Sequence, residues 1–195
     1  MSRIRHLLIP GLTNRWLAAV IGAAALFAFG AAISAADKYS LQVPGGLAFS
    51  EFKGYEDWQA LSVSQTDQAF ALILANPVMI DAYRAGVPGN GKPFPDGSKM
   101  AKIHWTPDKS ADAPDPSTKV PGTLKDVDFM VRDSKRFADS GNWGWAAFKY
   151  DAASGTFTPA TSADQPPQEH DAKCGFACHT IVQAKDYVFT AYPRR

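Results

Sequence analysis

The sequence CGFACH at residues 174–179 contains the residue types best suited to chemistry in this chain. Cys174 and Cys178 are the only cysteines among 195 residues, and His179 directly follows the second. The pattern is one residue longer than C-x-x-C-H, the attachment signature of c-type haem. There, two thiols are bonded to one porphyrin and the histidine is an axial ligand of its iron. The motif therefore predicts a covalent haem c, one per chain.

Two other interpretations of these residues stay open at this point. The cysteines could form a disulfide bond in an oxidising compartment, or all three residues could hold part of a zinc site. Zinc is the weaker alternative, because the chain has no second cysteine pair and its other histidines have no paired spacing. Those histidines are His6, His104 and His170.

The N-terminus has the pattern of a secretory signal. Three arginines precede an apolar run at residues 16–29, and small residues at 34–36 offer a cleavage site. We expect a signal peptide at residues 1–36, cleaved after Ala36, and a periplasmic mature protein. An uncleaved anchor is the alternative, because residues 16–36 are about as long as the roughly 20 residues that span a bilayer.

Composition limits the partners and the number of domains. The formal net charge is +1 and no basic stripe is present, so we expect no nucleic-acid partner. The chain after residue 36 suffices for one domain with a core, and not for two. Its 5 Trp, 6 Tyr and 12 Phe agree equally with a wrapped planar cofactor and with an ordinary aromatic core.

Short runs of alternating polar and apolar residues predict several strands. The expected strands lie at residues 61–64, 98–106, 123–132, 144–151 and 157–159. In the second of these, Met100, Lys102 and His104 share one face, because side chains alternate along a strand. The polar, proline-rich stretch 107–121 predicts a linker. One short helix is expected at residues 78–84, with Asn76 as its cap and Pro77 at its first position.

These elements predict an α+β fold: mainly an antiparallel sheet with a few peripheral helices, in a single domain. We expect three segments along the chain. They are the signal peptide at residues 1–36, an N-terminal extension at 37–54 and the haem domain at 55–195.

Several stretches in a fixed order resemble the cytochrome P-460 family. They are ALILANP at 71–77, PFPDG at 93–97, AKI at 101–103, GWA at 144–146, CH at 178–179 and DYVFT at 186–190. The resemblance covers residues 55–192.

The resemblance implies a small periplasmic c-type haem protein, mostly antiparallel β and commonly a homodimer, with one face of the iron open. Some members oxidise hydroxylamine, with nitric oxide as an intermediate or product and nitrous oxide as an end product, and pass electrons to a periplasmic acceptor. In these a lysine is also bonded to the porphyrin. A related branch, the cytochromes c-prime-beta, lacks that bond and binds nitric oxide and carbon monoxide.

By this resemblance, Cys174 and Cys178 are the thioether positions and His179 is the proximal iron ligand. The chain departs from the family pattern in having three residues, 175–177, between the cysteines where two are usual. That difference puts the geometry of the attachment loop, and one of the thioethers, in doubt.

The resemblance also assigns two further side chains. Lys102 matches the lysine bonded to the porphyrin, with Lys99 and Lys109 as rivals. Glu169 matches a carboxylate that assists hydroxylamine oxidation by accepting protons. Arg84 and His104 are weaker candidates for the pocket.

Three functions follow as hypotheses. The first is hydroxylamine oxidation at an open iron. The second is binding of nitric oxide or carbon monoxide without turnover. The third, plain electron transfer, would require a sixth ligand such as Met79, Met100 or Met130, although core packing explains these methionines better.

Overall fold

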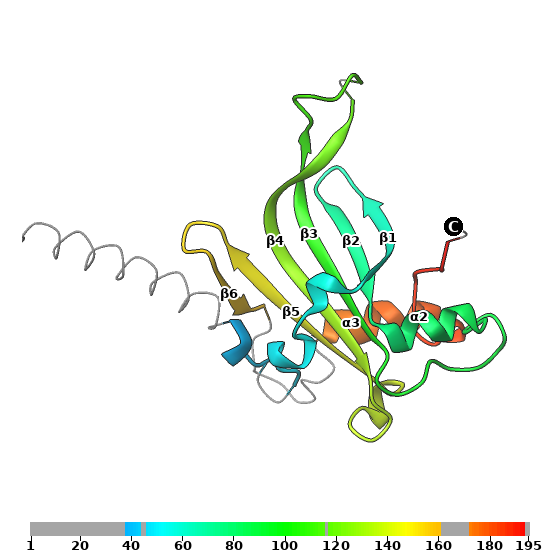
Figure 1. Ribbon diagram of the computed structural model, residues 1–195. Helices are drawn as coiled ribbons and strands as arrows, with labels where there is room; N and C mark the ends of the chain where they lie inside the picture. Colours follow the sequence, from blue (N-terminus) through cyan, green and yellow to red (C-terminus); the bar gives the residue numbers. More distant parts are fainter. Residues whose placement is uncertain (1–37, 44–45, 116, 161–171, 194–195) are drawn as a thin grey trace, which may run out of the picture. The chain divides into compact units, whose positions relative to one another are not determined.

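The chain folds around a six-stranded antiparallel sheet (Figure 1). The computed structural model describes residues 38–43, 46–115, 117–160 and 172–193, without the side chains of 172–174. Each strand pairs with the next strand in the chain. The strands are β1 Gln59–Gln65, β2 Phe70–Ala75, β3 Lys99–Lys109, β4 Lys119–Arg132, β5 Trp143–Asp151 and β6 Thr156–Pro159. The predicted single α+β domain, mainly antiparallel sheet with a few short helices, is confirmed.

The helices are short and lie outside the sheet. The α-helices are α2 Pro77–Arg84 and α3 Ala172–His179, and the 3₁₀ helices are η1 Lys38–Ser40, η2 Phe49–Phe52, η3 Tyr55–Asp57, η4 Ala138–Ser140 and η6 Thr180–Lys185. Helix α2 begins as predicted, because the Asn76 side chain accepts a hydrogen bond from Met79 N at 3.1 Å and Pro77 is the first helical residue. The same Asn76 oxygen accepts from Lys99 N at 3.0 Å. The cap therefore also ties α2 to the first residue of β3.

The segment that precedes β1 covers one face of the sheet. Phe49 and Phe52 of η2 are fully buried, and the Phe52 ring stacks on Phe129 of β4 with 4.1 Å between ring centroids. Val127 and Val131 lie in the same cluster, as the alternation along β4 predicts. The stretch expected to be an N-terminal extension thus contributes much of one of the two hydrophobic cores.

The opposite face of the sheet packs against α2, α3 and the chain after η6. Its core includes Met79, Tyr83, Phe94, Trp143 and Trp145. Met100 and Lys102 of β3 face this side, whereas Ala101 and Ile103 face the η2 side, as predicted. The candidate site lies on this second face.

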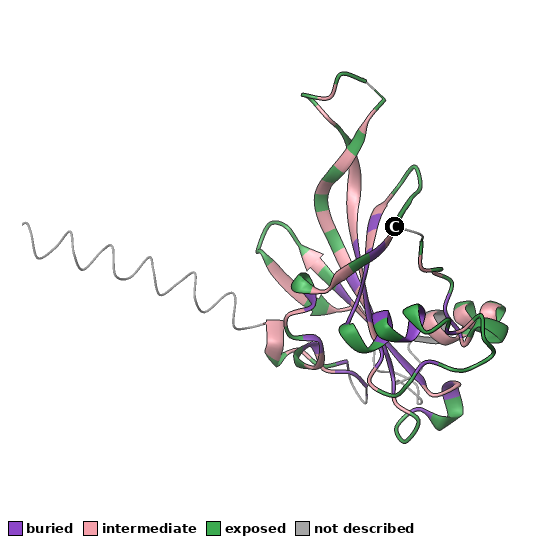
Figure 2. Cartoon of the chain, turned by 45° about the vertical axis from the view of Figure 1, so that its right-hand side comes forward, coloured by how far each residue is buried: buried purple, intermediate pink, exposed green. Residues whose placement is uncertain are grey.

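The β3–β4 hairpin is longer than the sequence predicts. The predicted linker at 107–121 is wrong at both ends, because β3 continues to Lys109 and β4 begins at Lys119. Pro107 pairs with Pro121 next to a register irregularity, the kind of position where a sheet tolerates residues without an N–H donor. The hairpin extends past β1 and β2 (Figure 1), and it has few buried residues compared with the base of the sheet (Figure 2).

Among the described residues, no helix has the length and apolar character needed to cross a membrane. The expected signal peptide at residues 1–36 lies outside the described residues.

Candidate functional site

A backbone carbonyl holds the imidazole of His179. This residue ends α3, and its Nδ1 lies 2.5 Å from the carbonyl oxygen of Tyr187. A carbonyl only accepts, so Nδ1 carries the proton and Nε2 keeps a free lone pair. Burial lowers the pKa of His179, and the charge of Lys102 lowers it further. The hydrogen bond to Tyr187 acts in the opposite direction. The net effect favours the neutral ring, which is the form that binds a metal.

A turn in the left-handed region positions that carbonyl. Asp186 and Tyr187 have φ angles of 52° and 62°, which are uncommon for residues other than glycine. The Asp186 carboxylate accepts a hydrogen bond from Phe94 N at 2.7 Å and lies 3.3 Å from Nη1 of the buried Arg132. Burial raises the pKa of Asp186, and the contacts with Phe94 and Arg132 act in the opposite direction. Contacts to the loop before β3 and to the end of β4 therefore fix the turn.

Helix α3 lies close to β5 because residue 175 has no side chain. A Cβ added to Gly175 would lie 2.5 Å from Cγ of Trp145, closer than real Cβ atoms approach. The Trp145 ring lies 5.6 Å from the His179 ring and 5.8 Å from that of Phe176. Glycine at this position thus allows the close approach of α3 that brings His179 to the sheet face.

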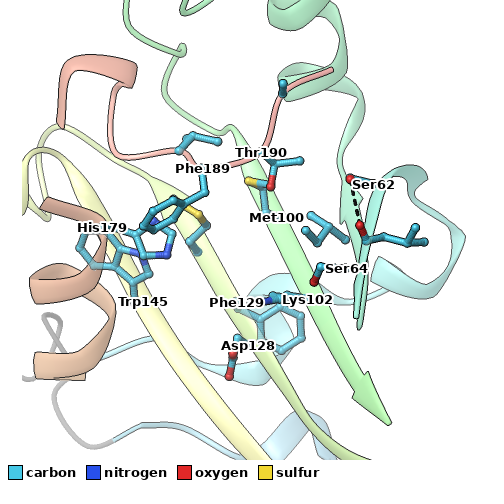
Figure 3. A pocket seen from close by; sticks show the side chains of 15 residues that line it. Ser62, Ser64, Met100, Lys102, Asp128, Phe129, Trp145, His179, Phe189 and Thr190 are labelled. Carbon is cyan, nitrogen blue, oxygen red and sulfur yellow. Dashed lines mark hydrogen bonds between the residues drawn. The ribbon is translucent and has the colours of Figure 1, made fainter. Parts of the chain in front are cut away.

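A cavity of about 510 Å³ lies beside His179, within the size range of small-molecule and cofactor sites. In Figure 3, His179, Phe189 and Trp145 lie on one side of it and the β1 serines on the other. Most of the lining is apolar. The lining residues are Ser62, Val63, Ser64, Ile73, Met100, Lys102, Asp128, Phe129, Met130, Trp145, His179, Val188, Phe189, Thr190 and Ala191.

The chain after η6 forms one wall of the cavity. The Tyr83 hydroxyl of α2 donates a hydrogen bond to the Thr190 carbonyl at 2.7 Å, which anchors this wall. Phe189 meets the His179 ring edge to face at 5.0 Å, yet it is 51% exposed. Val63, on the β1 side, is 62% exposed. Two large apolar side chains exposed at one cavity are typical of a surface that a ligand covers.

Lys102 and Asp128 form a polar part of the cavity wall. They are paired residues of β3 and β4, and the next pair on the same face is His104 with Asp126. Burial raises the pKa of Asp128 to about 6; the charge of Asp126 acts in the same direction, and His104 and Lys102 oppose it. The cavity therefore combines an unprotonated imidazole nitrogen with a carboxyl group that can hold a proton near pH 6.

The sequence matches the family model described as Cytochrome P460 over residues 52–190. The chain belongs to the cytochrome P460 family. This confirms the resemblance seen in the sequence and supports a haem cofactor of the cytochrome type. A search of curated proteins finds no significant match to the chain.

The described residues of this P460-family protein fit a haem. The free Nε2 of His179 is the donor that an iron porphyrin takes on its proximal side. The predominantly apolar lining suits a flat, apolar macrocycle, and a bound porphyrin would give the exposed Phe189 and Val63 an apolar contact.

The structure brings some predicted site residues together. Lys102 and His179 line the same cavity. Cys178 is exposed in α3 and does not line the cavity. Cys174 lies one helical turn before it, and its side chain is not described. Glu169 lies outside the described residues.

The weaker candidates lie elsewhere or have other partners. Lys99 donates to the Glu51 carbonyl, and Lys109 is an exposed residue at the far end of β3. Arg84 is exposed and pairs with Asp81. His104 lies next to the cavity without lining it. Met100 and Met130 do line it, whereas Met79 belongs to the core.

Sequence reasoning missed Asp128 and the carbonyl of Tyr187. Asp128 could have been found from its spacing, because Asp126 and Asp128 alternate with apolar residues on β4 as His104 and Lys102 do on β3. The contact of Tyr187 with His179 depends on a backbone turn, for which the side chains give no signal.

Proposed function

We propose that the protein is a periplasmic cytochrome with one covalent haem c that oxidises hydroxylamine, with nitric oxide as an intermediate or product and nitrous oxide as an end product. The observation that supports this most directly is the free Nε2 of His179 at a 510 Å³ cavity in a P460-family chain. The periplasmic location rests on the expected signal at residues 1–36. A homodimer and a periplasmic electron acceptor are part of the proposal.

In this proposal His179 is the proximal ligand and Cys174 and Cys178 carry the thioethers. When bound, the haem supplies a redox-active iron that accepts electrons from the nitrogen substrate. Lys102 lines the cavity and is the candidate for an additional bond to the porphyrin. The Tyr187 carbonyl keeps the His179 ring oriented, while Val188 and Phe189 line the cavity beside it.

The cavity walls also supply an observation for a second function. Apart from Lys102, Asp128 and His179, the lining side chains are apolar or carry only a hydroxyl group or, in Trp145, an indole N–H. Such a cavity suits uncharged diatomic ligands, so reversible binding of nitric oxide or carbon monoxide without turnover is the alternative.

Three measurements on protein matured in a host with a c-type haem assembly system test the proposal. Intact mass is expected to show one covalent haem, the ferric spectrum to be high spin, and hydroxylamine to be consumed with an added electron acceptor. Lys102→Ala is expected to keep the haem and lose any red-shifted ferrous band. Haem binding with no turnover favours the gas-binding function. A low-spin spectrum that Met100→Ala or Met130→Ala converts to high spin favours electron transfer. Protein without haem contradicts all three functions: hydroxylamine oxidation, gas binding and electron transfer.

A further inference from the structure

Four titratable side chains form two paired rows on the cavity face of β3 and β4. Lys102 pairs with Asp128, and His104 pairs with Asp126. His104 Nδ1 lies 2.5 Å from an Asp126 oxygen and 3.8 Å from an Asp128 oxygen. The side chain of His104 is 15% exposed, so these contacts act through partly desolvated groups.

Of the two carboxylates near His104, Asp126 and Asp128, only Asp128 lines the cavity. Among the described residues, the charged and titratable groups that face Asp128 are Lys102 and His104 on β3, Asp126 on β4 and His179 across the cavity. Its partner on β5 is Ala147, and Lys149 stands opposite Asp126. Asp128 is therefore the described carboxylate that a molecule in this cavity meets directly.

We propose that Asp128 is the group that accepts a proton from a small protic ligand bound in the cavity, and that His104, held by Asp126, is a positioning residue that sets its proton affinity. This inference rests on the proposed function in one respect, because it takes the cavity as the place where a haem-bound nitrogen ligand sits. It adds a described residue to the predicted role of Glu169.

The step is a proton transfer that involves no redox change. An N–H or O–H bond of the ligand breaks, an O–H bond forms on Asp128, and the electron pair of the broken bond stays on the ligand. Raised proton affinity makes Asp128 a better base near neutral pH than an ordinary carboxylate. Burial is the largest cause of the raised pKa of Asp128, and Asp126 acts in the same direction, whereas His104 and Lys102 lower this pKa.

Two probes of the ferric protein separate proton transfer from simple access. Hydrogen cyanide must lose its proton on binding, whereas nitric oxide carries none. We expect the cyanide association rate constant of the wild type to rise as pH passes through about 6, and Asp128→Asn to lower it by at least about tenfold, because general-base assistance contributes on that order or more. The association rate of nitric oxide is expected to change less than about twofold.

His104→Gln gives the positioning residue its own test. His104 lowers the pKa of Asp128 and Asp126 raises it, so the midpoint of the cyanide pH profile is expected to move upward when His104 is replaced. A protonated-carboxyl band in infrared difference spectra is expected to titrate with the same midpoint and to be absent in Asp128→Asn. The matched control is Asp108→Asn, at an exposed position of β3 away from the cavity, which is expected to leave both profiles unchanged.

The outcomes separate this inference from the proposed function. An unchanged cyanide profile in Asp128→Asn overturns the inference, even if the wild type oxidises hydroxylamine. Equal loss of cyanide and nitric oxide binding also overturns it, because it indicates a blocked cavity. If Asp128→Asn loses the pH dependence of cyanide association and the wild type never oxidises hydroxylamine, the inference is supported and the proposed function is rejected.

Discussion

His179 donates a hydrogen bond to the carbonyl of Tyr187, a residue only eight positions later in the chain. The 3₁₀ helix η6 and the left-handed turn at Asp186 lie between them, so donor and acceptor belong to one closed loop. The orientation of the ring therefore depends on this loop, which the Asp186 carboxylate joins to Phe94 and Arg132.

Replacing His179 by glycine removes the imidazole and leaves both cysteines. The expected result is a haem that stays attached but shows altered ferric and ferrous spectra, and added imidazole is expected to restore them by entering the space left behind. Absorption spectroscopy with an imidazole titration checks this. The control is His104→Gln, which removes the other described histidine and is expected to keep the axial ligand. A spectrum of His179→Gly equal to that of the wild type would show that another residue binds the iron.

Asp186→Asn tests the anchor of the loop. Asparagine also tolerates the left-handed region and retains an oxygen for Phe94 N, but it leaves the buried Arg132 without its closer acidic partner. Breaking a buried pair from one side costs about 3–5 kcal/mol, and Arg132 keeps contacts with the Gly141 carbonyl and Asp96, so we expect a loss of about 2 kcal/mol. Denaturant unfolding measures it. Asp139→Asn, at an exposed position, is the control, and equal stability of the two variants would contradict the anchoring role.

Local sequence signals predicted most of the fold, because they act within a few residues. The cap at Asn76 and the two faces of β3 follow from side-chain chemistry and alternation, and both are confirmed. The predicted length of the β3–β4 hairpin was too short, because Pro107 and Pro121 are residues that usually end strands. Their pairing next to an irregular register lets both strands continue. That compensation needs two segments at once, so neither segment reveals it alone.

The site was predicted less completely, for a similar reason. His179 and Lys102 were identified from a motif and a family resemblance, and both line the cavity. Asp128 lies at the cavity because β4 pairs with β3. The Tyr187 carbonyl reaches His179 because the chain turns at Asp186. A local pattern can place such a residue on one face of a strand, as the alternation on β4 does for Asp128, but the groups that it meets depend on strand pairing and on backbone turns.

Gly175→Ala tests the contact between α3 and β5. Alanine favours a helix over glycine by about 1 kcal/mol, but its Cβ would meet Trp145 at 2.5 Å, and overpacking of this kind typically costs about 1–3 kcal/mol. We expect net destabilisation of about 1 kcal/mol and a changed haem spectrum, because the helix that carries His179 must move. Ala177→Ser, an exposed change in the same helix, is the control in thermal unfolding and absorption measurements. Stabilisation of Gly175→Ala would mean that α3 does not pack this closely.

Asp128→Asn is expected to change how stability depends on pH. Burial raises the pKa of Asp128 from 3.8 to about 6, so between these values the folded protein holds a proton that the unfolded chain has released. The free energy of unfolding of the wild type therefore falls as pH rises from about 4 to 6, and the variant lacks this loss. The full shift corresponds to nearly 3 kcal/mol by the usual conversion of about 1.4 kcal/mol per pKa unit.

The side chain of Asp128 is 47% exposed, so solvent screening reduces the expected gain of the variant to about 1 kcal/mol above pH 6. Denaturant unfolding of the ferric protein at several pH values between 4 and 7 measures this difference. Asp108→Asn is the control and is expected to track the wild type across the range. A stability difference between Asp128→Asn and wild type that stays constant, or that shrinks as pH rises, would show that burial does not raise the proton affinity of this carboxyl group.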